Sequence, residues 1–179
     1  MTIWVLTISD RASQGIYADR AGPAVMEELE RLLSPPPRFF YRCVPDGYDS
    51  VLTALTEAAG LSPGVSPRKT TPHREAKTLS EAPPDWIITV GGTGIGPRDT
   101  TPEATRDFIE GEIPGLAEYL RQKSLEETVF AVFSRGIVGY RGTTLVANFP
   151  GSERAARFYA RQLAPLMDHA LRMRRGEGH

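Results

Sequence analysis

The apolar and polar positions along the chain alternate between short strand-like runs and longer helix-like segments. Residues 3–9 form a nearly continuous apolar run rich in β-branched side chains, which is typical of a strand buried on both faces of a parallel sheet. Residues 23–33 then place their apolar side chains on one helical face, and three prolines at 35–37 end that helix. The same reasoning predicts strands at 39–44, 86–90, 137–140 and 143–148, and helices at 50–59, from 102, at 115–125 and from 152.

This alternation of strands and helices predicts an α/β fold with a mainly parallel sheet. The 179 residues fit one domain. In such sheets ligands bind at the carboxyl ends of the strands. The loops that leave those ends are therefore the first place to look for chemistry, and they span residues 10–20, 45–49, 91–101, 141–143 and 149–152.

The helix starts carry recognisable capping residues, and one segment breaks the alternation. Asp49 fits the N-cap of the helix at 50–59, Thr101 fits the N-cap before Pro102, and Ser152 fits the N-cap of the last helix. Residues 61–84 instead contain five prolines, many Ser and Thr, and little periodicity. We interpret this stretch as a long loop or a partly disordered insertion.

The composition of the chain excludes several classes of binding and catalytic site. A formal net charge of −1 argues against a nucleic-acid protein that binds through bulk positive charge. A single Cys excludes an intrachain disulfide and a CxxC site, the three His form no HExxH pattern, and no GxxxxGK[ST] phosphate loop is present. No apolar run is long enough to span a membrane and no signal peptide is recognisable, so we expect a cytoplasmic protein. Carboxylates, hydroxyls, arginines and backbone amides remain as reactive or binding groups.

The strongest local signal is the glycine-rich loop at residues 91–99, between a buried strand and a helix. Glycines allow the backbone to approach a ligand closely, and a helix N-terminus attracts anions. The spacing is not the dinucleotide fingerprint GxGxxG, because Pro97 stands where the third glycine is needed. The alternative is a tight turn without a ligand. We predict phosphate binding here, by Gly91, Gly92, Thr93, Gly94 and Thr100.

Acidic residues at the strand ends suggest a cation. A carboxylate beside an anion site, as at Asp99, is explained by a Mg²⁺ ion held between them, although Asp99 could equally cap the following helix. Asp46 lies in a Pro-Asp-Gly turn, where an Asx turn is the stronger alternative. Ser9 and Asp10 follow the first strand and are binding candidates, with capping as their alternative.

Two further segments join these candidates. The run from Asn148 through Pro150 and Gly151 to Ser152 repeats the sequence of strand, glycine turn and helix N-terminus, so it is either a second phosphate site or a cap alone. Ser134 and the neighbouring Arg135 offer a hydroxyl and a guanidinium, or form an ordinary surface pair.

Three of these segments together resemble one family. They are Thr7–Asp19 (TISDRASQGIYAD), the glycine loop with its continuation (GGTG, then PRDTTPEA), and Asn148–Ser152 (NFPGS). In order and spacing they resemble the MogA/MoaB proteins of molybdenum cofactor biosynthesis, more closely on the MogA side, and the gephyrin G domain. Two departures are the insertion at 61–84 and Glu153-Arg154, where the family has Pro-Lys.

The resemblance implies a three-layer α/β/α sandwich and molybdopterin adenylyltransferase activity. The substrates would be molybdopterin and ATP with Mg²⁺, and the family's two important acids fall on Asp46 and Asp99. It further implies a homotrimer, or a hexamer as on the MoaB side, and contact with a molybdenum-inserting protein. The alternatives are a non-catalytic MoaB-like pterin-binding or scaffold protein, and a different nucleotide enzyme that uses the same anion loops.

Overall fold

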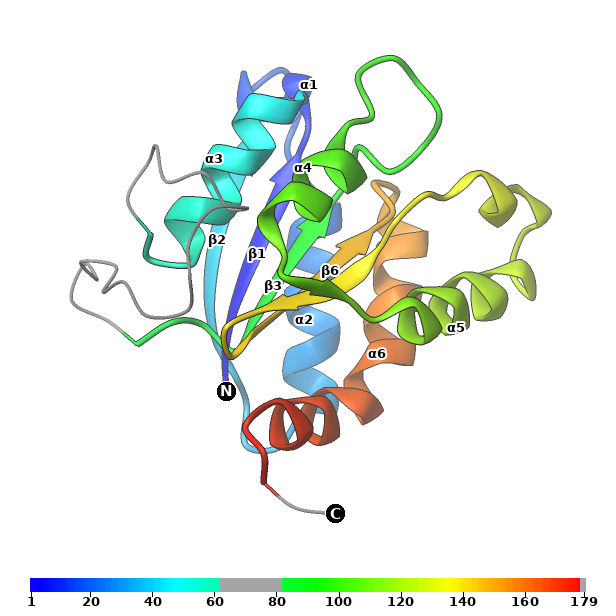
Figure 1. The fold of residues 1–179 in the computed structure, drawn as a ribbon. Helices are drawn as coiled ribbons and strands as arrows, with labels where there is room; N and C mark the ends of the chain where they lie inside the picture. Colours follow the sequence, from blue (N-terminus) through cyan, green and yellow to red (C-terminus); the bar gives the residue numbers. More distant parts are fainter. Residues whose placement is uncertain (62–81, 178–179) are drawn as a thin grey trace.

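The computed structural model describes residues 1–61 and 82–177. Most of the insertion predicted at 61–84 lies outside these residues. The described residues form a six-stranded sheet with the strand order β2-β1-β3-β6-β5-β4 (Figure 1). Neighbouring strands are parallel from β2 to β6, and β5 pairs antiparallel with both β6 and β4. The strands are β1 (Thr2–Ile8), β2 (Arg38–Val44), β3 (Trp86–Val90), β4 (Gly111–Glu112), β5 (Val138–Arg141) and β6 (Thr144–Phe149).

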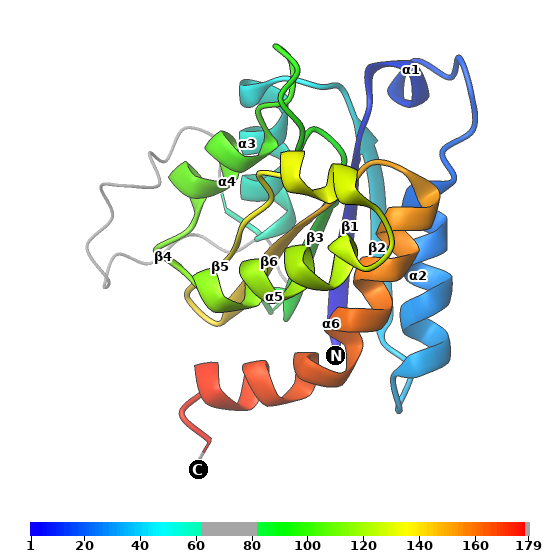
Figure 2. The same ribbon diagram turned by 90° about the vertical axis from the view of Figure 1, so that its right-hand side faces the viewer.

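Helices cover both faces of this sheet, as Figures 1 and 2 show. One core cluster lies under α2, α5 and α6, and the other lies under α3 and α4. The predicted three-layer α/β/α sandwich with a mainly parallel sheet is therefore confirmed. The helices are α1 (Asp10–Ser13), α2 (Ala21–Leu32), α3 (Tyr48–Ala58), α4 (Thr101–Phe108), α5 (Pro114–Leu125) and α6 (Glu153–Arg174), with a 3₁₀ helix η2 (Val129–Phe133) after α5. No helix among the described residues is long and apolar enough to cross a membrane.

The burial of β3 explains why its sequence is a continuous apolar run. All five of its residues are buried, because helices cover both faces of a central parallel strand. Its side chains alternate between the layers: Trp86, Ile88 and Val90 belong to the α2/α5/α6 core, and Ile87 belongs to the α3/α4 core. The prediction of a central strand from this continuous apolar run is therefore confirmed.

Two predicted helix caps are wrong by one or two residues. Gly47, not Asp49, is the N-cap of α3, because its φ of 121° closes the turn and its carbonyl already accepts the N–H of Val51 at 3.1 Å. Thr100, not Thr101, is the N-cap of α4. The cap at Ser152 is confirmed, since its Oγ accepts the N–H of Ala155 at 3.3 Å.

A buried carboxylate joins α2 to α6. Glu28 is only 3% exposed, and its oxygens accept hydrogen bonds from Arg161 at 3.0 and 3.4 Å and from Arg157 at 3.4 Å, with Arg31 as a third partner. Arg161, followed by the other two guanidinium groups, lowers the pKa of Glu28 to about 2, against the opposing effect of burial. The packing of these two long helices therefore depends on an ionised Glu28.

We predict that Glu28→Gln lowers the free energy of unfolding by about 1–3 kcal/mol at pH 7. Because the folded-state pKa of Glu28 is depressed, its contribution is complete above the ordinary value of 4.5 and is lost as the pH falls toward 2. Urea unfolding between pH 7 and 3 should show this acid loss in the wild type and a smaller loss in Glu28→Gln. Glu27→Gln is the matched control, since Glu27 is exposed and Arg157 is its only ion-pair partner among the described residues. Equal effects of both substitutions would contradict the prediction.

Candidate functional site

The parallel register brings four predicted loops to one edge of the sheet. The strands β1, β2, β3 and β6 all end there, at Ile8, Val44, Val90 and Phe149. This is the edge at the top of Figure 1, where the loop between β3 and α4 rises above the sheet. Ligands of parallel α/β sheets bind at this edge. The structure thus brings most of the predicted site residues to one end of the molecule.

The glycine loop begins with an unusually close contact between strand ends. Gly91 and Gly92 have φ angles of 115° and 63°, which residues with a side chain rarely adopt. A Cβ on Gly91 would lie 2.4 Å from the carbonyl oxygen of Ile8, and a Cβ on Gly151 would lie 3.2 Å from the Cα of Gly91. Both values are shorter than ordinary contact, so these glycines let the ends of β1, β3 and β6 approach one another.

Asp10 and Asp46 hold the ends of β1 and β2 together. The N–H of Asp10 donates to Oδ2 of Asp46 at 2.8 Å, and the N–H of Asp46 donates to Oδ1 of Asp10 at 3.1 Å. The guanidinium of Arg98 lies 2.9 Å from Oδ2 of Asp10 and also donates to the carbonyl of Asp46 at 3.0 Å. Arg98 was not among the predicted site residues, and it connects the glycine loop to this acidic pair.

Asp99 lies inside the glycine loop. Its Oδ2 accepts the N–H of Gly96 at 2.8 Å, and a Cβ on Gly94 or Gly96 would come within 2.9 Å of the same oxygen. The last two glycines of the loop therefore make room for this carboxylate. The other oxygen of Asp99 accepts no hydrogen bond from the described residues, and the same holds for Oδ1 of Asp46.

Arg135 fixes the shape of the loop from the opposite side. Its Nε donates to the carbonyl of Gly94 at 2.7 Å, and its two terminal nitrogens bond to the carbonyl of Asp99 and to the carboxylate of Glu103. Its own N–H donates to the carbonyl of Thr93 at 2.9 Å. The guanidinium is thus engaged in holding backbone, which the sequence did not reveal. The hydroxyl of neighbouring Ser134 accepts the N–H of Gly136 at a long 3.5 Å.

Polar groups at the start of α4 lack partners. The hydroxyl oxygens of Thr100 and Thr101 and Oε2 of Glu103 are buried and make no hydrogen bond within the described residues. Thr93 is 5% exposed, and its hydroxyl makes none either. Leaving a buried polar group unpaired costs about 1–3 kcal/mol. These groups lie together at the glycine loop and the first turn of α4, and Thr93 is the one among them whose side chain lines a cavity.

Other predicted residues have structural contacts. Asn148 is 2% exposed, and its amide donates to the hydroxyls of Thr89 and Thr105, each at 2.9 Å, while its oxygen accepts the N–H of Ile137 at 3.2 Å. Both amide hydrogens are therefore used inside the protein. Ser9 caps the short helix α1 through the N–H of Ala12 at 3.3 Å, so the capping alternative is observed for it as well as for Ser152.

Asp19, which belongs to the quoted motif, also has a structural environment. Its carboxylate accepts the hydroxyl of Thr7 at 2.7 Å, the phenol of Tyr41 at 2.8 Å, and the N–H of Ala21 at the start of α2 at 3.0 Å. Burial, followed by this carboxylate, raises the pKa of Tyr41, so the phenol remains a protonated donor at every physiological pH. Asp19 thereby ties β1, β2 and α2 together.

A cavity of about 370 Å³ opens between the glycine loop, η2 and the start of α6. It is lined by seven residues of the predicted site: Gly92, Thr93, Gly94, Asp99, Ser134, Pro150 and Gly151. Its remaining lining includes Phe130, Phe133 and the buried ring of Tyr159, whose pKa is raised by burial. Asp10 and Asp46 are not part of this lining. The cavity therefore lies between the glycine loop and the turn before α6. The pair of Asp10 and Asp46 lies outside it, at the ends of β1 and β2.

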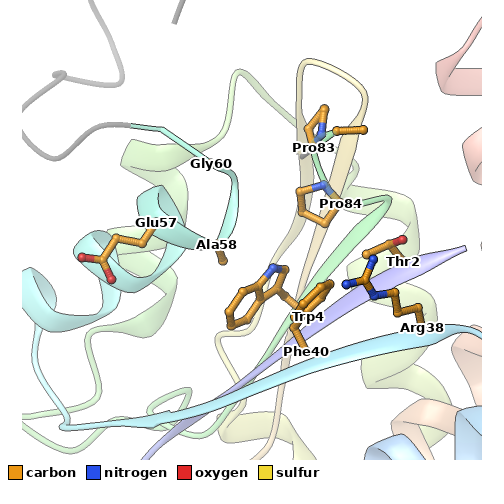
Figure 3. A pocket seen from close by; sticks show the side chains of 10 residues that line it. Thr2, Trp4, Arg38, Phe40, Glu57, Ala58, Gly60, Pro83 and Pro84 are labelled. Atoms are coloured by element: carbon orange, nitrogen blue, oxygen red, sulfur yellow. The ribbon is translucent and has the colours of Figure 1, made fainter. Parts of the chain in front are cut away.

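A second cavity, of about 420 Å³, lies among different residues near the start of β1 (Figure 3). Trp4 stacks on Phe40 with ring centroids 5.1 Å apart, and the guanidinium of Arg38 lies 4.6 Å from the centre of the Phe40 ring. Its described lining contains none of the predicted site residues. The cavity at the carboxyl edge is therefore the candidate site.

The described residues contain no group of three or more acidic, His or Cys side chains that would hold a metal ion by themselves. Mg²⁺ commonly uses only one or two carboxylates and completes its shell with water and substrate phosphates. The free oxygens of Asp46 and Asp99 match that requirement in kind. A metal bound here would depend on the ligand for most of its coordination.

Comparison with known proteins agrees with this geometry. The sequence model of a family described as "Probable molybdopterin binding domain" matches residues 4–169. The chain belongs to this family. The molybdopterin adenylyltransferase of Helicobacter pylori strain 26695 is 33% identical over 169 residues, which cover 94% of this chain and 85% of that protein. The molybdenum cofactor synthesis protein cinnamon of Drosophila melanogaster is 34% identical over 97% of this chain, which spans 25% of the length of that relative.

The fold comparison points to the same family. The crystal structure of the molybdopterin biosynthesis enzyme MoaB from Thermus thermophilus superposes with a TM-score of 0.77 and 36% identity, covering 98% of this chain and 97% of that one. The resemblance inferred from the three sequence segments is therefore confirmed at the level of the family and the fold.

We predict that Asn148→Ala lowers the free energy of unfolding by about 2–3 kcal/mol, because it leaves buried hydroxyl and N–H groups without partners. Urea unfolding at pH 7 measures the loss. Ser152→Ala is the control at the same end of β6 and should cost about 1 kcal/mol, the usual value for a lost helix cap. A loss for Asn148→Ala no larger than that of the control would show that its amide bonds contribute little to folding.

Proposed function

We propose that this protein is a Mg²⁺-dependent molybdopterin adenylyltransferase. In this reaction the terminal phosphate oxygen of molybdopterin attacks the α-phosphorus of ATP. A new phosphorus–oxygen bond forms, the bond to the β-phosphate breaks, and pyrophosphate leaves. The observation that carries the proposal is the cavity in which the glycine loop, the unpaired hydroxyl of Thr93 and Asp99 converge, in a chain whose relatives include named molybdopterin adenylyltransferases.

The backbone supports phosphate binding at this place. The glycine loop and the first turn of α4 supply backbone N–H groups, and the helix dipole favours an anion there. The unpaired hydroxyl of Thr93, which lines the cavity, adds a donor that a phosphate oxygen would use. Transfer of an adenylyl group needs positioning and charge neutralisation more than covalent chemistry from the protein. Because the attacking phosphate is already ionised near neutral pH, no His or Lys base is required.

Asp46 and Asp99 are the residues that would hold Mg²⁺. Each keeps one carboxylate oxygen without a hydrogen bond from the described residues. When bound, the ion neutralises the phosphate charge that builds up on the leaving pyrophosphate. Arg98, which contacts Asp10 and the backbone of Asp46, holds the acidic pair in place from the glycine loop. The other proposed substrate contacts are Gly91, Gly92, Thr100, Pro150 and Gly151.

A non-catalytic MoaB-like pterin-binding or scaffold protein is the second candidate, because the family description names molybdopterin binding and no transfer reaction. Such a protein would bind the pterin without turning over a nucleotide. Calorimetry with ATP and Mg²⁺ separates the two candidates: the adenylyltransferase binds the nucleotide, and absence of binding would refute it.

We predict that the purified protein releases pyrophosphate when it receives molybdopterin, ATP and Mg²⁺. Asp99→Asn and Asp46→Asn should each reduce kcat by at least about 100-fold, the scale expected when a group that neutralises transition-state charge is lost. Glu112→Gln is the matched control, because this exposed acid pairs only with Arg106 at 2.7 Å among the described residues. Turnover of Asp99→Asn at the wild-type rate would remove Asp99 from the chemistry.

We further propose that the chain forms a homotrimer and passes its product to a molybdenum-inserting protein, as the family resemblance implies. Light scattering coupled to size-exclusion chromatography should give a mass of three chains of 19.7 kDa. A mass of six chains would favour the MoaB-like hexamer, and a mass of one chain would contradict both assemblies.

A further inference from the structure

The segment after α5 exposes an unusual run of apolar side chains. In η2, Val129 is 68% exposed, Phe130 74%, Val132 54% and Phe133 53%. Figure 1 shows this segment as the short yellow-green helix beyond the end of α5. Single exposed apolar residues are common on protein surfaces, whereas a contiguous exposed apolar patch marks a binding surface. The question is which of these four side chains bind something, and what.

Of the four exposed apolar side chains of η2, only the two aromatic ones line the candidate cavity. Phe130 and Phe133 line the cavity of about 370 Å³, and Val129 and Val132 do not. Gly92, Thr93 and Gly94 line the same cavity from the glycine loop. One wall therefore carries flat aromatic rings, and another carries glycine backbone and a hydroxyl. An occupant that satisfies both walls has an apolar planar part joined to an anionic part.

The polar wall has a second sign of a missing ligand besides the helix N-terminus. Thr93 is 5% exposed, and its hydroxyl makes no hydrogen bond within the described residues. The hydroxyl of Thr101, at the start of α4, is fully buried and has no partner there either. Thr93 lines the cavity and Thr101 does not, so a phosphate oxygen in the cavity would supply an acceptor for the hydroxyl of Thr93, as well as for the N–H groups of the loop.

The aromatic wall is held firmly beside the polar wall. Thr128 caps η2 by accepting the N–H of Phe130 at 3.3 Å, and Ala131 in the same turn is buried. Arg121 donates from α5 to the carbonyl of Ser134 at 2.9 Å, and Arg135 donates to Gly94 at 2.7 Å. These bonds connect η2 to α5 on one side and to the glycine loop on the other. The backbone that carries the two rings is thereby positioned before a ligand arrives, which lowers the entropic cost of binding.

We propose that Phe130 and Phe133 form the stacking surface for the planar nitrogen heterocycle of the ligand whose phosphate lies against the glycine loop. This rests on the proposed function, and the heterocycle is either the adenine of ATP or the pterin of molybdopterin. Adenine and the pyrimidine ring of the pterin are both flat, and both ligands carry phosphate, so the same two walls accept either one. Stacking on an aromatic ring discriminates little between heterocycles, and titrations with each substrate identify which of them lies here.

The test compares Phe130→Ala/Phe133→Ala with Val129→Ala/Val132→Ala. The two double variants truncate neighbouring exposed side chains of one helix, but only the first pair lines the cavity. Isothermal titration calorimetry measures binding of ATP with Mg²⁺, of molybdopterin under anaerobic conditions, and of inorganic pyrophosphate, which has no ring. The aromatic variant should bind one ring-bearing substrate about 10- to 100-fold more weakly, the range expected for loss of aromatic stacking. Its affinity for pyrophosphate should stay within about twofold of the wild type, because only the ring contact is removed.

The pattern of losses assigns the heterocycle. A loss confined to ATP places adenine on the two rings, and a loss confined to molybdopterin places the pterin there. Unchanged affinity for both substrates overturns the inference while leaving the proposed function intact. If the wild type itself binds neither substrate, the proposed function fails instead.

Two controls keep the result interpretable. Equal losses in the valine variant, or a changed molecular mass of the aromatic variant, would identify η2 as an interface between copies of the chain and would overturn the proposal. Phe130→Trp keeps a flat ring at this position, so we expect it to retain the affinity of the wild type. Thermal unfolding checks folding, and Phe130→Leu/Phe133→Leu, which keeps apolar bulk without a ring, replaces the alanine variant if that one does not fold.

Discussion

The close packing of three strand ends is the constraint on which the rest of the site depends. Gly91 lies against the carbonyl of Ile8 and against Gly151, at distances that a side chain on either glycine would not allow. The N–H of Gly91 also donates to the carbonyl of Phe149 at 3.0 Å. Because β1, β3 and β6 are drawn together at this point, the glycine loop and the turn before α6 share one cavity. Separated by even one side chain, they would be two independent loops.

Arginine supplies most of the charge that holds this arrangement. Arg135 bonds to two backbone carbonyls and one carboxylate at once, and Arg98 spans a carboxylate and a carbonyl. The planar guanidinium offers several donors in fixed directions, whereas the ammonium of Lys is a single point of charge. The scarcity of Lys in the sequence thus has a structural counterpart: the loops of this site need cations that bond to several oxygens, and Arg135 in particular is engaged by the protein itself.

The sequence predicted the layers of the fold and the edge of the sheet at which the candidate residues gather, but not the hydrogen-bond partners of those residues. The apolar run at 86–90 predicted a buried strand, and the glycines at 91–96 predicted a tight loop after it. Both predictions were possible because burial on two faces and a positive φ angle each restrict the residue types that fit. The helix starts at Gly47 and Thr100 were missed because neighbouring Asp and Thr residues are equally good caps in isolation. The roles of Arg98 and Arg135 depend on contacts between residues far apart in the chain, and η2 has no periodicity from which a helix or its exposure would be predicted.

The buried polar groups at this edge of the sheet differ in whether the protein itself supplies their hydrogen-bond partners. Asn148 and Thr105 are almost fully buried, and they bond to each other across the sheet and α4. Thr101, one turn before Thr105 on α4, is equally buried but has no partner among the described residues. Residue type and burial are the same for these two threonines, so neither property distinguishes them. The difference is that Thr105 faces the core while Thr101 faces Gly92, whose missing Cβ would otherwise lie 2.3 Å from its hydroxyl. An unpaired hydroxyl is costly in a folded protein, and here it lies directly behind Gly92, which lines the cavity, while Thr101 itself does not.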